Sequence, residues 1–188
     1  VPFASLPDKA VVDNSITFNA ISKTFNLAGM KNAYFFTTNP VLLSRIKQHH
    51  RGDLSTLGVV ANEAAYRHGA QWFDQVRPYL DNNHKIVESA VAKMPGVSVT
   101  KAQGTYLSWI NFSSVIESVD ASEMAIRNGK ASPEHYFQDW LVENAGVYMN
   151  PGSNYSAGGQ GHMRMNLGSS RFVVQEALDS VAAAISKV

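Results

Sequence analysis

Hydrophobic and polar residues alternate in two short stretches near the start of the chain. Residues 15–20 alternate with a period of two, and residues 33–38 are aromatic and β-branched and stop at Asn39-Pro40. Both stretches predict β-strands. The connection between them, SKTFNLAG at residues 22–29, is interpreted as a turn, and it carries Lys23. A lysine is therefore expected at the junction of two strands.

Apolar residues at helical spacing predict helices farther along the chain. We expect them over residues 41–50, 59–69, 71–93 and 171–187. Residues 51–58 are interpreted as a polar loop, and Pro78 predicts a kink in the long helix. A further helix begins at Ser132-Pro133-Glu134, with a capping hydroxyl and an acid near the positive end of the dipole, and Gly146 ends it.

The second half of the chain also contains strand patterns. Residues 97–100 and 104–112 predict a hairpin, and residues 147–149 and 162–167 predict two strands around the glycine-rich loop 158–161. That loop lacks the Gly-Lys-Ser/Thr sequence of a nucleotide-binding loop, so we interpret it as a flexible turn over a site. Because strands and helices alternate, the fold class is α/β or α+β.

Composition and charge narrow the classes of function. The 188 residues are 45% hydrophobic, enough for one globular unit or two small ones. The net charge of +1, with lysine and arginine scattered, provides no basic surface for nucleic acid or an anionic membrane, and no apolar run is long enough to span one. The absence of cysteine excludes thiolate metal sites and fits a reducing compartment, so we expect a cytoplasmic location. His49 and His50 point in different directions on a helix, which favours a polar helix end over a metal site.

Lys23 has two interpretations on spacing alone. A lysine at a strand end with small neighbours can be desolvated, which lowers the pKa of its amine and makes it a nucleophile toward an aldehyde. The alternative, a solvated surface lysine, is the commoner state of this residue type. The spacing leaves both open.

Six motifs in a fixed order give the chain a family resemblance. They are VPFASL, ISKTFNLAGMK, ANEAAYRHGAQWFDQVRPYLDNN, GTYLSW, PGSNYS and HMRMNLG. Together they resemble fold-type I pyridoxal-phosphate (PLP) enzymes, in particular the branch of cystathionine β-lyases (C-S lyases) and related aminotransferases. The resemblance covers nearly the whole chain, and it is specific because all the motifs occur together and in order.

The resemblance implies an α/β fold that corresponds to the C-terminal part of the fold-type I PLP-dependent transferase fold. Residues 1–66 would be the end of the large domain and carry the cofactor lysine, and residues 67–188 would form a long linking helix and a small α/β domain. In the family, a glycine-rich phosphate loop, a ring-stacking aromatic residue and an aspartate that contacts the pyridine nitrogen lie upstream of the lysine. We therefore expect this sequence to be the C-terminal half of a longer enzyme, which alone binds PLP poorly and is inactive.

The resemblance also assigns roles to four residues. Lys23 matches the lysine that forms a Schiff base with PLP and moves the Cα proton as general acid/base. Ser22 and Lys31 match positions that hold the cofactor phosphate, and Arg164 matches the arginine that binds the substrate α-carboxylate. Lys31 departs from the usual arginine and loses its two-pronged hydrogen bonding, while Ala20 replaces a frequent serine. A surface ion pair is the alternative for Lys31, and a structural ion pair the alternative for Arg164.

Further residues have weaker assignments. Asn166 and Ser153 are candidates for the mouth of the site, although turn chemistry explains them nearly as well. Ser55 and Thr56 either reach the cofactor of a neighbouring subunit or cap a turn. Tyr106 and Trp109 occupy family positions, but aromatic residues on a strand usually belong to the core, and we expect core positions for both.

The leading functional prediction is PLP-dependent β-elimination on a small-molecule amino acid, in an enzyme that forms a homodimer. A leaving group on Cβ, such as the thioether of cystathionine, would depart after the Cα proton is removed. Transamination by an aminotransferase is the alternative within enzymes, and it uses the same residues. A non-catalytic aminotransferase-like domain is the third possibility, although the sequence contains no DNA-binding helix-turn-helix.

Overall fold

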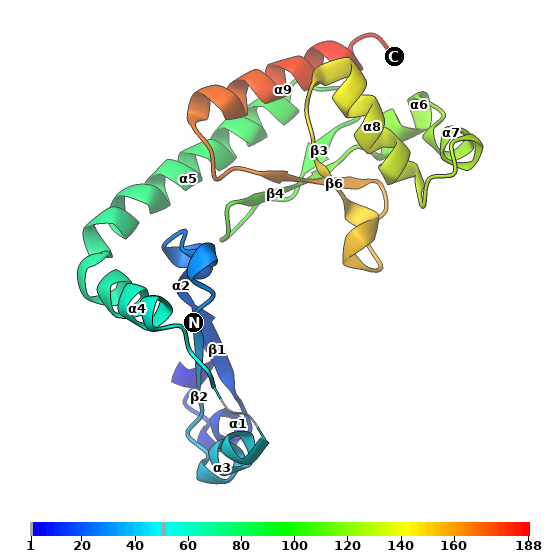
Figure 1. The fold of residues 1–188 in the computed structure, drawn as a ribbon. Helices are drawn as coiled ribbons and strands as arrows, with labels where there is room; N and C mark the ends of the chain where they lie inside the picture. Colours follow the sequence, from blue (N-terminus) through cyan, green and yellow to red (C-terminus); the bar gives the residue numbers. More distant parts are fainter. Residues whose placement is uncertain (1, 50–51) are drawn as a thin grey trace. The chain divides into compact units, whose positions relative to one another are not determined.

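The chain divides within one long helix, α5 (Ala70–Val91), into two units (Figure 1). The computed structural model describes residues 2–49 and 52–188. Unit 1 is Val1–Val76 and unit 2 is Arg77–Val188, whereas the boundary expected from the sequence follows residue 66. The two units are described separately below.

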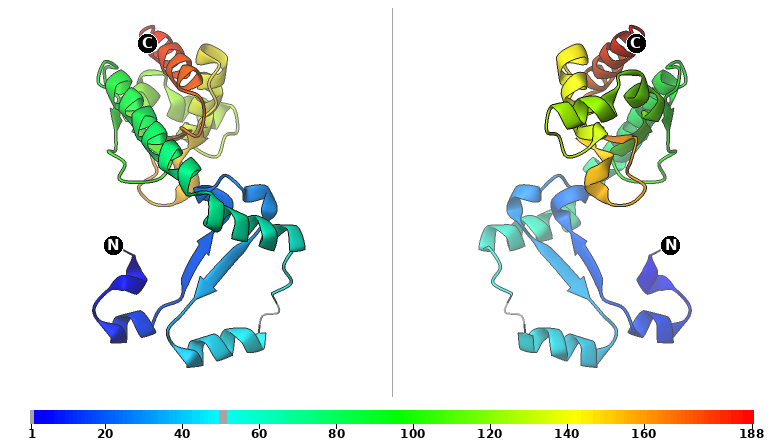
Figure 2. Two further views of the ribbon diagram at one scale, coloured as in Figure 1. Left: turned by 90° about the vertical axis from the view of Figure 1, so that its left-hand side faces the viewer. Right: turned by 90° about the vertical axis from the view of Figure 1, so that its right-hand side faces the viewer.

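A two-stranded antiparallel ribbon organises unit 1. Strand β1 (Thr17–Ala20) pairs with β2 (Ala33–Phe36), with Thr17 opposite Phe36 and Ala20 opposite Ala33. The ribbon connects at one end to α2 (Ile21–Thr24) and η2 (Ala28–Met30), and its other end lies near α1 (Lys9–Asp13) and α3 (Pro40–His49) (Figures 1 and 2). The remaining elements of unit 1 are η1 (Phe3–Ser5), α1 (Lys9–Asp13), α3 (Pro40–His49) and α4 (Thr56–His68).

Helical turns replace the simple turn that we predicted between the two strands. Residues Ile21–Thr24 form α2, and Ala28–Met30 form the 3-10 helix η2. Helix α4 also begins earlier than predicted, because the Ser55 hydroxyl accepts a hydrogen bond from the Gly58 N–H at 3.4 Å and caps the helix. The pair His49-His50 and the predicted loop 51–58 fall partly on residues 50 and 51, outside the described residues.

Unit 2 is built on a four-stranded antiparallel sheet in the order β3-β4-β6-β5. The predicted hairpin is confirmed as β3 (Ser98–Val99) and β4 (Leu107–Asn111), and β6 (His162–Asn166) matches its predicted strand. The strand predicted at 147–149 is wrong, because the pairing with β6 occurs at β5 (Asn150–Pro151). The preceding Met149 carbonyl instead accepts a hydrogen bond from Gln138 Nε2 at 2.6 Å.

Three helices cover one face of this sheet: α5, α8 (Pro133–Ala145) and α9 (Arg171–Ile185) (Figure 1). Helix α5 continues through Pro78. The helices and the sheet share a core that includes Val87, Val91, Ile110, Phe137, Leu141, Met163, Leu178 and Val181. Each such side chain contributes about 1.5–3 kcal/mol through burial. The predicted site residue Arg164 lies on the opposite face of the sheet.

Two short helices were missed from the sequence, α6 (Ser113–Ser118) and α7 (Ala121–Arg127). Neither begins with a side-chain cap: the residue before α6 is Phe112, and the residue before α7 is Asp120, whose φ is 51°. Their lengths of 6 and 7 residues are too short for a clear apolar period. The glycine that ends α8, Gly146, adopts the expected left-handed conformation with φ 65°.

Candidate active site

The connection between β1 and β2 brings Ser22, Lys23 and Lys31 into one segment of unit 1. Ser22 is half-buried in α2, and both lysines are exposed. Within the described residues, neither lysine forms an ion pair. Because the Lys23 side chain is exposed, the described residues do not provide the burial that would lower the pKa of a reactive lysine. The ion pair considered for Lys31 is not formed among the described residues.

Lys31 has an unusual backbone conformation. It ends η2 with φ 47° and ψ 44°, in the left-handed region. A residue with a Cβ atom adopts this conformation at a cost of about 1–2 kcal/mol. Asn26 in the same connection also has a positive φ, of 55°. Strain of this kind is concentrated at binding sites, where the surrounding structure maintains it.

An aromatic cluster fastens this connection to the helices that follow it. The Phe25 ring lies 5.4 Å from Tyr66, 6.2 Å from Trp72 and 6.3 Å from Phe73, measured between centroids. Gly69 makes this packing possible, because a Cβ atom there would lie 2.6 Å from Phe25 Cε1. The segment that carries Lys23 is thus anchored to α4 and to the start of α5.

Tyr66 also contacts strand β2. Its hydroxyl lies 3.1 Å from the hydroxyl of Tyr34, at hydrogen-bond distance. Burial, followed by the hydrogen bond and the charge of Tyr34, raises the pKa of Tyr66 to about 12.

Ser55 acts as the cap of α4, so of the two roles considered for it the local one, capping a turn, is observed.

Arg164 stands in the middle of β6, on the sheet face opposite the helical core. Its Cα is paired with Trp109 on one side and with Asn150 on the other. The guanidinium carbon lies 4.6 Å from the centroid of the Tyr155 ring, a cation–π contact. The Nε–H is buried and has no acceptor among the described residues. Since an unpaired buried N–H costs about 1–3 kcal/mol, this arginine is suited to an anionic acceptor.

The core positions expected for Tyr106 and Trp109 are wrong. Both are half-buried and lie outside the buried core. The core side of β4 is formed by Ser108 and Ile110, so the alternation of the strand turns Trp109 to the other face. There Trp109 stacks on His162 at 5.5 Å between centroids and meets the edge of Tyr155 at 5.7 Å. An aromatic surface therefore adjoins Arg164.

The start of α8 differs from its prediction. Ser132 precedes the helix, but its hydroxyl caps no backbone N–H. It hydrogen-bonds instead to Glu134 Oε2 at 2.6 Å and lies 2.9 Å from His135 Nδ1. Burial raises the pKa of the Glu134 carboxyl, but hydrogen bonds from Ser132, the Gly161 N–H and Ser153 outweigh it, so the pKa lies below its usual range. From the sequence, Glu134 was assigned only a role at the positive end of the helix dipole, and its burial was not predicted.

Two candidates for the mouth of the site have local hydrogen-bond roles. Asn166 Oδ1 accepts from the Gly168 N–H at 2.9 Å, and the Ser153 hydroxyl lies 2.8 Å from the Ser132 hydroxyl. In the loop 158–161, Gly159 and Gly161 are buried rather than free over the surface. The turn expected there is thus packed against its neighbours.

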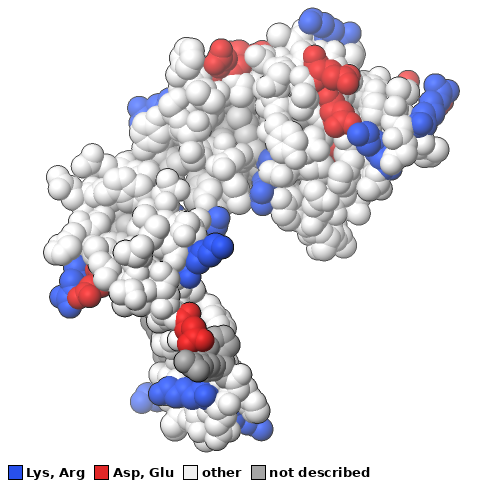
Figure 3. Space-filling view, viewed as in Figure 1, with Lys and Arg blue, Asp and Glu red and all other residues white. Residues whose placement is uncertain are grey.

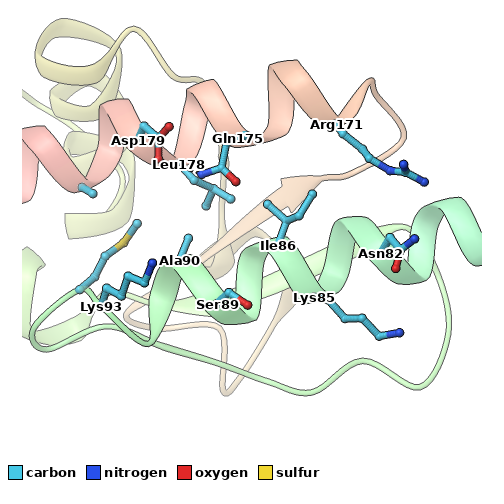
Figure 4. Close-up of a pocket in the computed structure, with 12 residues that line it drawn as sticks. Asn82, Lys85, Ile86, Ser89, Ala90, Lys93, Arg171, Gln175, Leu178 and Asp179 are labelled. Carbon is cyan, nitrogen blue, oxygen red and sulfur yellow. Dashed lines mark hydrogen bonds between the residues drawn. The ribbon is translucent and has the colours of Figure 1, made fainter.

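A groove of about 450 Å³ runs between α5 and α9 in unit 2 (Figure 4). Three of its charged side chains have partners: Lys85 pairs with Asp81 at 2.7 Å, Arg171 lies 4.2 Å over the Tyr79 ring, and Asp179 accepts from Gln175. The fourth, Lys93, forms no ion pair within the described residues. None of the predicted site residues lines this groove. We therefore place the candidate site elsewhere.

Other classes of site find little support in the described part of the chain. No group of His, Cys, Asp and Glu side chains there is arranged to hold a metal ion. No helix within residues 2–49 and 52–188 combines the length and apolar character of a membrane span. On the face shown in Figure 3, basic and acidic side chains are scattered among uncharged ones. The candidate groups are therefore Ser22, Lys23 and Lys31 in unit 1, and Arg164 with its aromatic neighbours in unit 2.

Comparison with known proteins identifies the family to which this chain belongs. Residues 3–181 match the family described as aminotransferase class I and II. The chain is 30% identical over 191 residues to cystathionine beta-lyase PatB of Bacillus subtilis (strain 168), covering 98% of this chain and 45% of that protein. It is 24% identical over 181 residues to an aspartate aminotransferase of Pyrococcus horikoshii, covering 94% and 42%.

A solved structure extends the comparison to the fold. The PLP-bound C-S lyase from Staphylococcus hominis superposes with a TM-score of 0.81 and 29% identity, covering 93% of this chain and 43% of that one. The predicted α/β class, part of the fold-type I PLP-dependent fold, is thereby confirmed. The chain spans less than half the length of these relatives. On the match over residues 3–181, the chain belongs to the aminotransferase class I and II family.

Proposed function

We propose that the chain carries the lysine and the carboxylate-binding arginine of a PLP-dependent enzyme that acts on an amino acid. The observation that carries this proposal is the connection from Ser22 to Lys31, which presents an amine, a hydroxyl and a second ammonium group in one short segment. Neither ammonium is neutralised by an acid among the described residues. Such a set suits a ligand that combines an aldehyde with a phosphate.

The residues present fit PLP in their chemistry. Lys23 would hold its aldehyde covalently, and Ser22 and Lys31 would hold its phosphate through a hydroxyl and a charge. The left-handed conformation of Lys31, φ 47°, is a strained feature of the kind found at ligand sites. When bound, PLP supplies the aldehyde for attachment and a ring that withdraws electrons from the substrate Cα.

The chain's own residues would then divide the work. Arg164 binds the α-carboxylate through two parallel hydrogen bonds, one of them from its unpaired Nε–H, and so fixes the direction of the Cα–H bond. The Lys23 amine removes the Cα proton as general base and holds it at Nζ. The half-buried ring of Trp109 and the more exposed ring of Tyr155 flank the arginine on one side.

We favour β-elimination over transamination. In this reaction the Cα–H and Cβ–S bonds of a thioether amino acid break, and uptake of one water gives a thiol, pyruvate and ammonia. The similarity to a cystathionine beta-lyase at 30% identity supports this branch. Transamination is the second candidate, because the chain is also 24% identical to an aspartate aminotransferase. In that reaction Lys23 would again hold and move the Cα proton, and no leaving group on Cβ would be needed.

The role of Lys23 is tested by visible absorption of the intact protein with added PLP. We expect an absorption band in the wild type that is absent from Lys23→Ala. Lys9→Ala, which changes an exposed lysine of α1 in the same unit, is the matched control and should keep the band. An unchanged band in Lys23→Ala would reject the assignment of this lysine.

The reaction branch is tested with L-cystathionine as substrate. Pyruvate released without an added keto acid would support elimination, whereas an absolute requirement for a keto-acid acceptor would support transamination. Failure of both reactions, in protein that keeps the Lys23-dependent band, would favour a non-catalytic domain. A homodimer in the cytoplasm is the setting we propose for this enzyme, and light scattering of the purified protein tests the dimer.

A further inference from the structure

Glu134 is a buried acid that the proposed chemistry does not use. It lies in the first turn of α8 and is 4% exposed. Its Oε1 accepts a hydrogen bond from the Gly161 N–H at 2.7 Å, and its Oε2 accepts one from the Ser132 hydroxyl at 2.6 Å. No cation pairs with it within the described residues. A carboxylate buried in this way is stabilised by its donors and by the positive end of the helix dipole.

These hydrogen bonds reach both ends of the segment 152–161. At its start, the Ser153 hydroxyl lies 2.8 Å from the Ser132 hydroxyl that Glu134 accepts from. At its end, the Gly161 N–H donates directly to Glu134. The segment also closes on itself, since a Cβ atom at Gly152 would lie 2.1 Å from the Gly159 carbonyl oxygen. Glu134 thus fastens a closed loop at both of its ends.

The same loop carries Tyr155, the aromatic neighbour of Arg164. Its ring lies 4.6 Å from the guanidinium carbon and meets the Trp109 ring edge-on at 5.7 Å. A displacement of the loop would therefore move the surface against which the arginine side chain rests. No acid among the described residues forms an ion pair with Arg164, and its guanidinium lies over the Tyr155 ring.

We propose that Glu134 is a positioning residue for Arg164, acting through the loop 152–161 and the Tyr155 ring. The inference rests on the proposed function, in which Arg164 binds the substrate carboxylate. An arginine side chain has many rotamers, and holding it in one of them beforehand reduces the entropy lost when a carboxylate binds. The hydrogen bonds of Glu134 supply that order from outside the binding surface.

The first experiment needs no substrate. In a nitrogen-15 NMR spectrum of the chain, the Arg164 Nε–H resonance, assigned by its loss in Arg164→Lys, reports on the ring above which the guanidinium lies. We expect an upfield position in the wild type, in Glu134→Gln, which keeps an acceptor for Gly161, and in the control Glu143→Ala, an exposed acid of α8. We expect a shift toward free arginine in Glu134→Ala and Tyr155→Ala.

An unchanged Nε–H resonance in Glu134→Ala would overturn the proposal. If that variant does not fold, Ser153→Ala takes its place, because it removes only the hydrogen bond at the start of the loop. A resonance that stays at the wild-type position in Ser153→Ala would likewise overturn the proposal, and a shift in the direction of Tyr155→Ala would support it.

The second experiment measures binding of L-alanine, an amino acid without a leaving group, through the same resonance. We expect Glu134→Ala to weaken binding roughly tenfold, the upper end of the cost of ordering one long side chain on binding. In the Tyr155→Ala background the same change should have no further effect, since the path from Glu134 to Arg164 is already broken. Equal losses in both backgrounds would overturn the proposal. If the wild-type Nε–H resonance does not shift when L-alanine is added, the proposed function of Arg164 is rejected. The first experiment would still test Glu134, because it needs no substrate.

Discussion

Lys31 combines a positive charge with a backbone conformation that disfavours it. We expect Lys31→Gly to stabilise the protein by about 0.5 kcal/mol, because relief of the strained φ of 47° exceeds the entropy that glycine adds to the unfolded chain. The same change should weaken PLP binding roughly tenfold, since it removes a charge-assisted contact to the phosphate. Thermal unfolding and a PLP titration measure the two effects.

Asn26→Gly is the matched control for this prediction. Asn26 also has a positive φ, of 55°, in the same connection, but it carries no charge. Asparagine tolerates this conformation better than lysine does, so its stability gain should be smaller and its PLP affinity unchanged. Equal PLP affinities for both variants would contradict a role of Lys31 at the phosphate.

The buried carboxyl of Glu134 makes stability depend on acid pH. Burial disfavours its charged form, but the donors Ser132, Gly161 and Ser153 more than compensate, so its pKa is lower in the folded state than in the unfolded state. The contribution to stability is therefore complete above the ordinary glutamate value of 4.5 and is lost as the pH falls through the folded pKa. Urea unfolding between pH 3 and pH 6 should show a shallower decline for Glu134→Gln than for the wild type. Parallel curves would contradict this prediction.

At the level of elements, close packing at Gly69 determines how α4 and α5 hold the lysine connection. A Cβ atom there would lie 2.4 Å from the Ala65 carbonyl oxygen and 2.6 Å from the Phe25 ring. We expect Gly69→Ala to destabilise the protein by about 1–3 kcal/mol, because backbone and ring must both move. Gly52→Ala, where nothing lies within 4 Å, is the control, and chemical denaturation compares the two. Equal stabilities would show that Phe25 repacks freely.

The elements also show what a sequence pattern can and cannot predict. Alternation located strand β4, but it did not identify the buried face, because Ser108 takes a core position and Trp109 does not. Which face of β4 is buried depends on which side of the sheet the helices cover, and those helices are other segments of the chain. The helix end marked by Gly146 followed the sequence, whereas the cap at Ser55 was not recognised and α4 begins earlier than predicted. Helices α6 and α7 were missed because they are too short for a clear apolar period.

The candidate site was predictable only where its chemistry lies within one motif. Lys23 and Arg164 became candidates because their flanking residues resemble those of a family. Glu134 did not, since its burial depends on the N–H of Gly161, 27 residues farther along the chain. Its contacts are set by how the loop 152–161 folds back, and no local pattern reports that.

At the level of the whole molecule, the two units have unequal cores. Unit 2 buries a continuous cluster that includes Phe112, Phe137 and Leu141. Among the described residues of unit 1, the buried hydrophobic side chains are Val12, Ile21 and Ala65, while Phe18 remains 71% exposed. A two-stranded ribbon has marginal stability without further packing. Stability should therefore differ between the units of one chain.

Hydrogen–deuterium exchange measures this difference directly. We expect amides of β1 and β2 to exchange roughly tenfold or more faster than those of β4 and β6, because little apolar surface must be exposed to open the ribbon. Addition of PLP should slow exchange around Lys23 and Lys31 and leave the core of unit 2 unchanged, since a ligand protects the segment that it binds. Equal exchange in both sheets would show that unit 1 is as stable as unit 2. Slower exchange in unit 2 alone on PLP addition would place the cofactor away from Lys23 and contradict the proposed site.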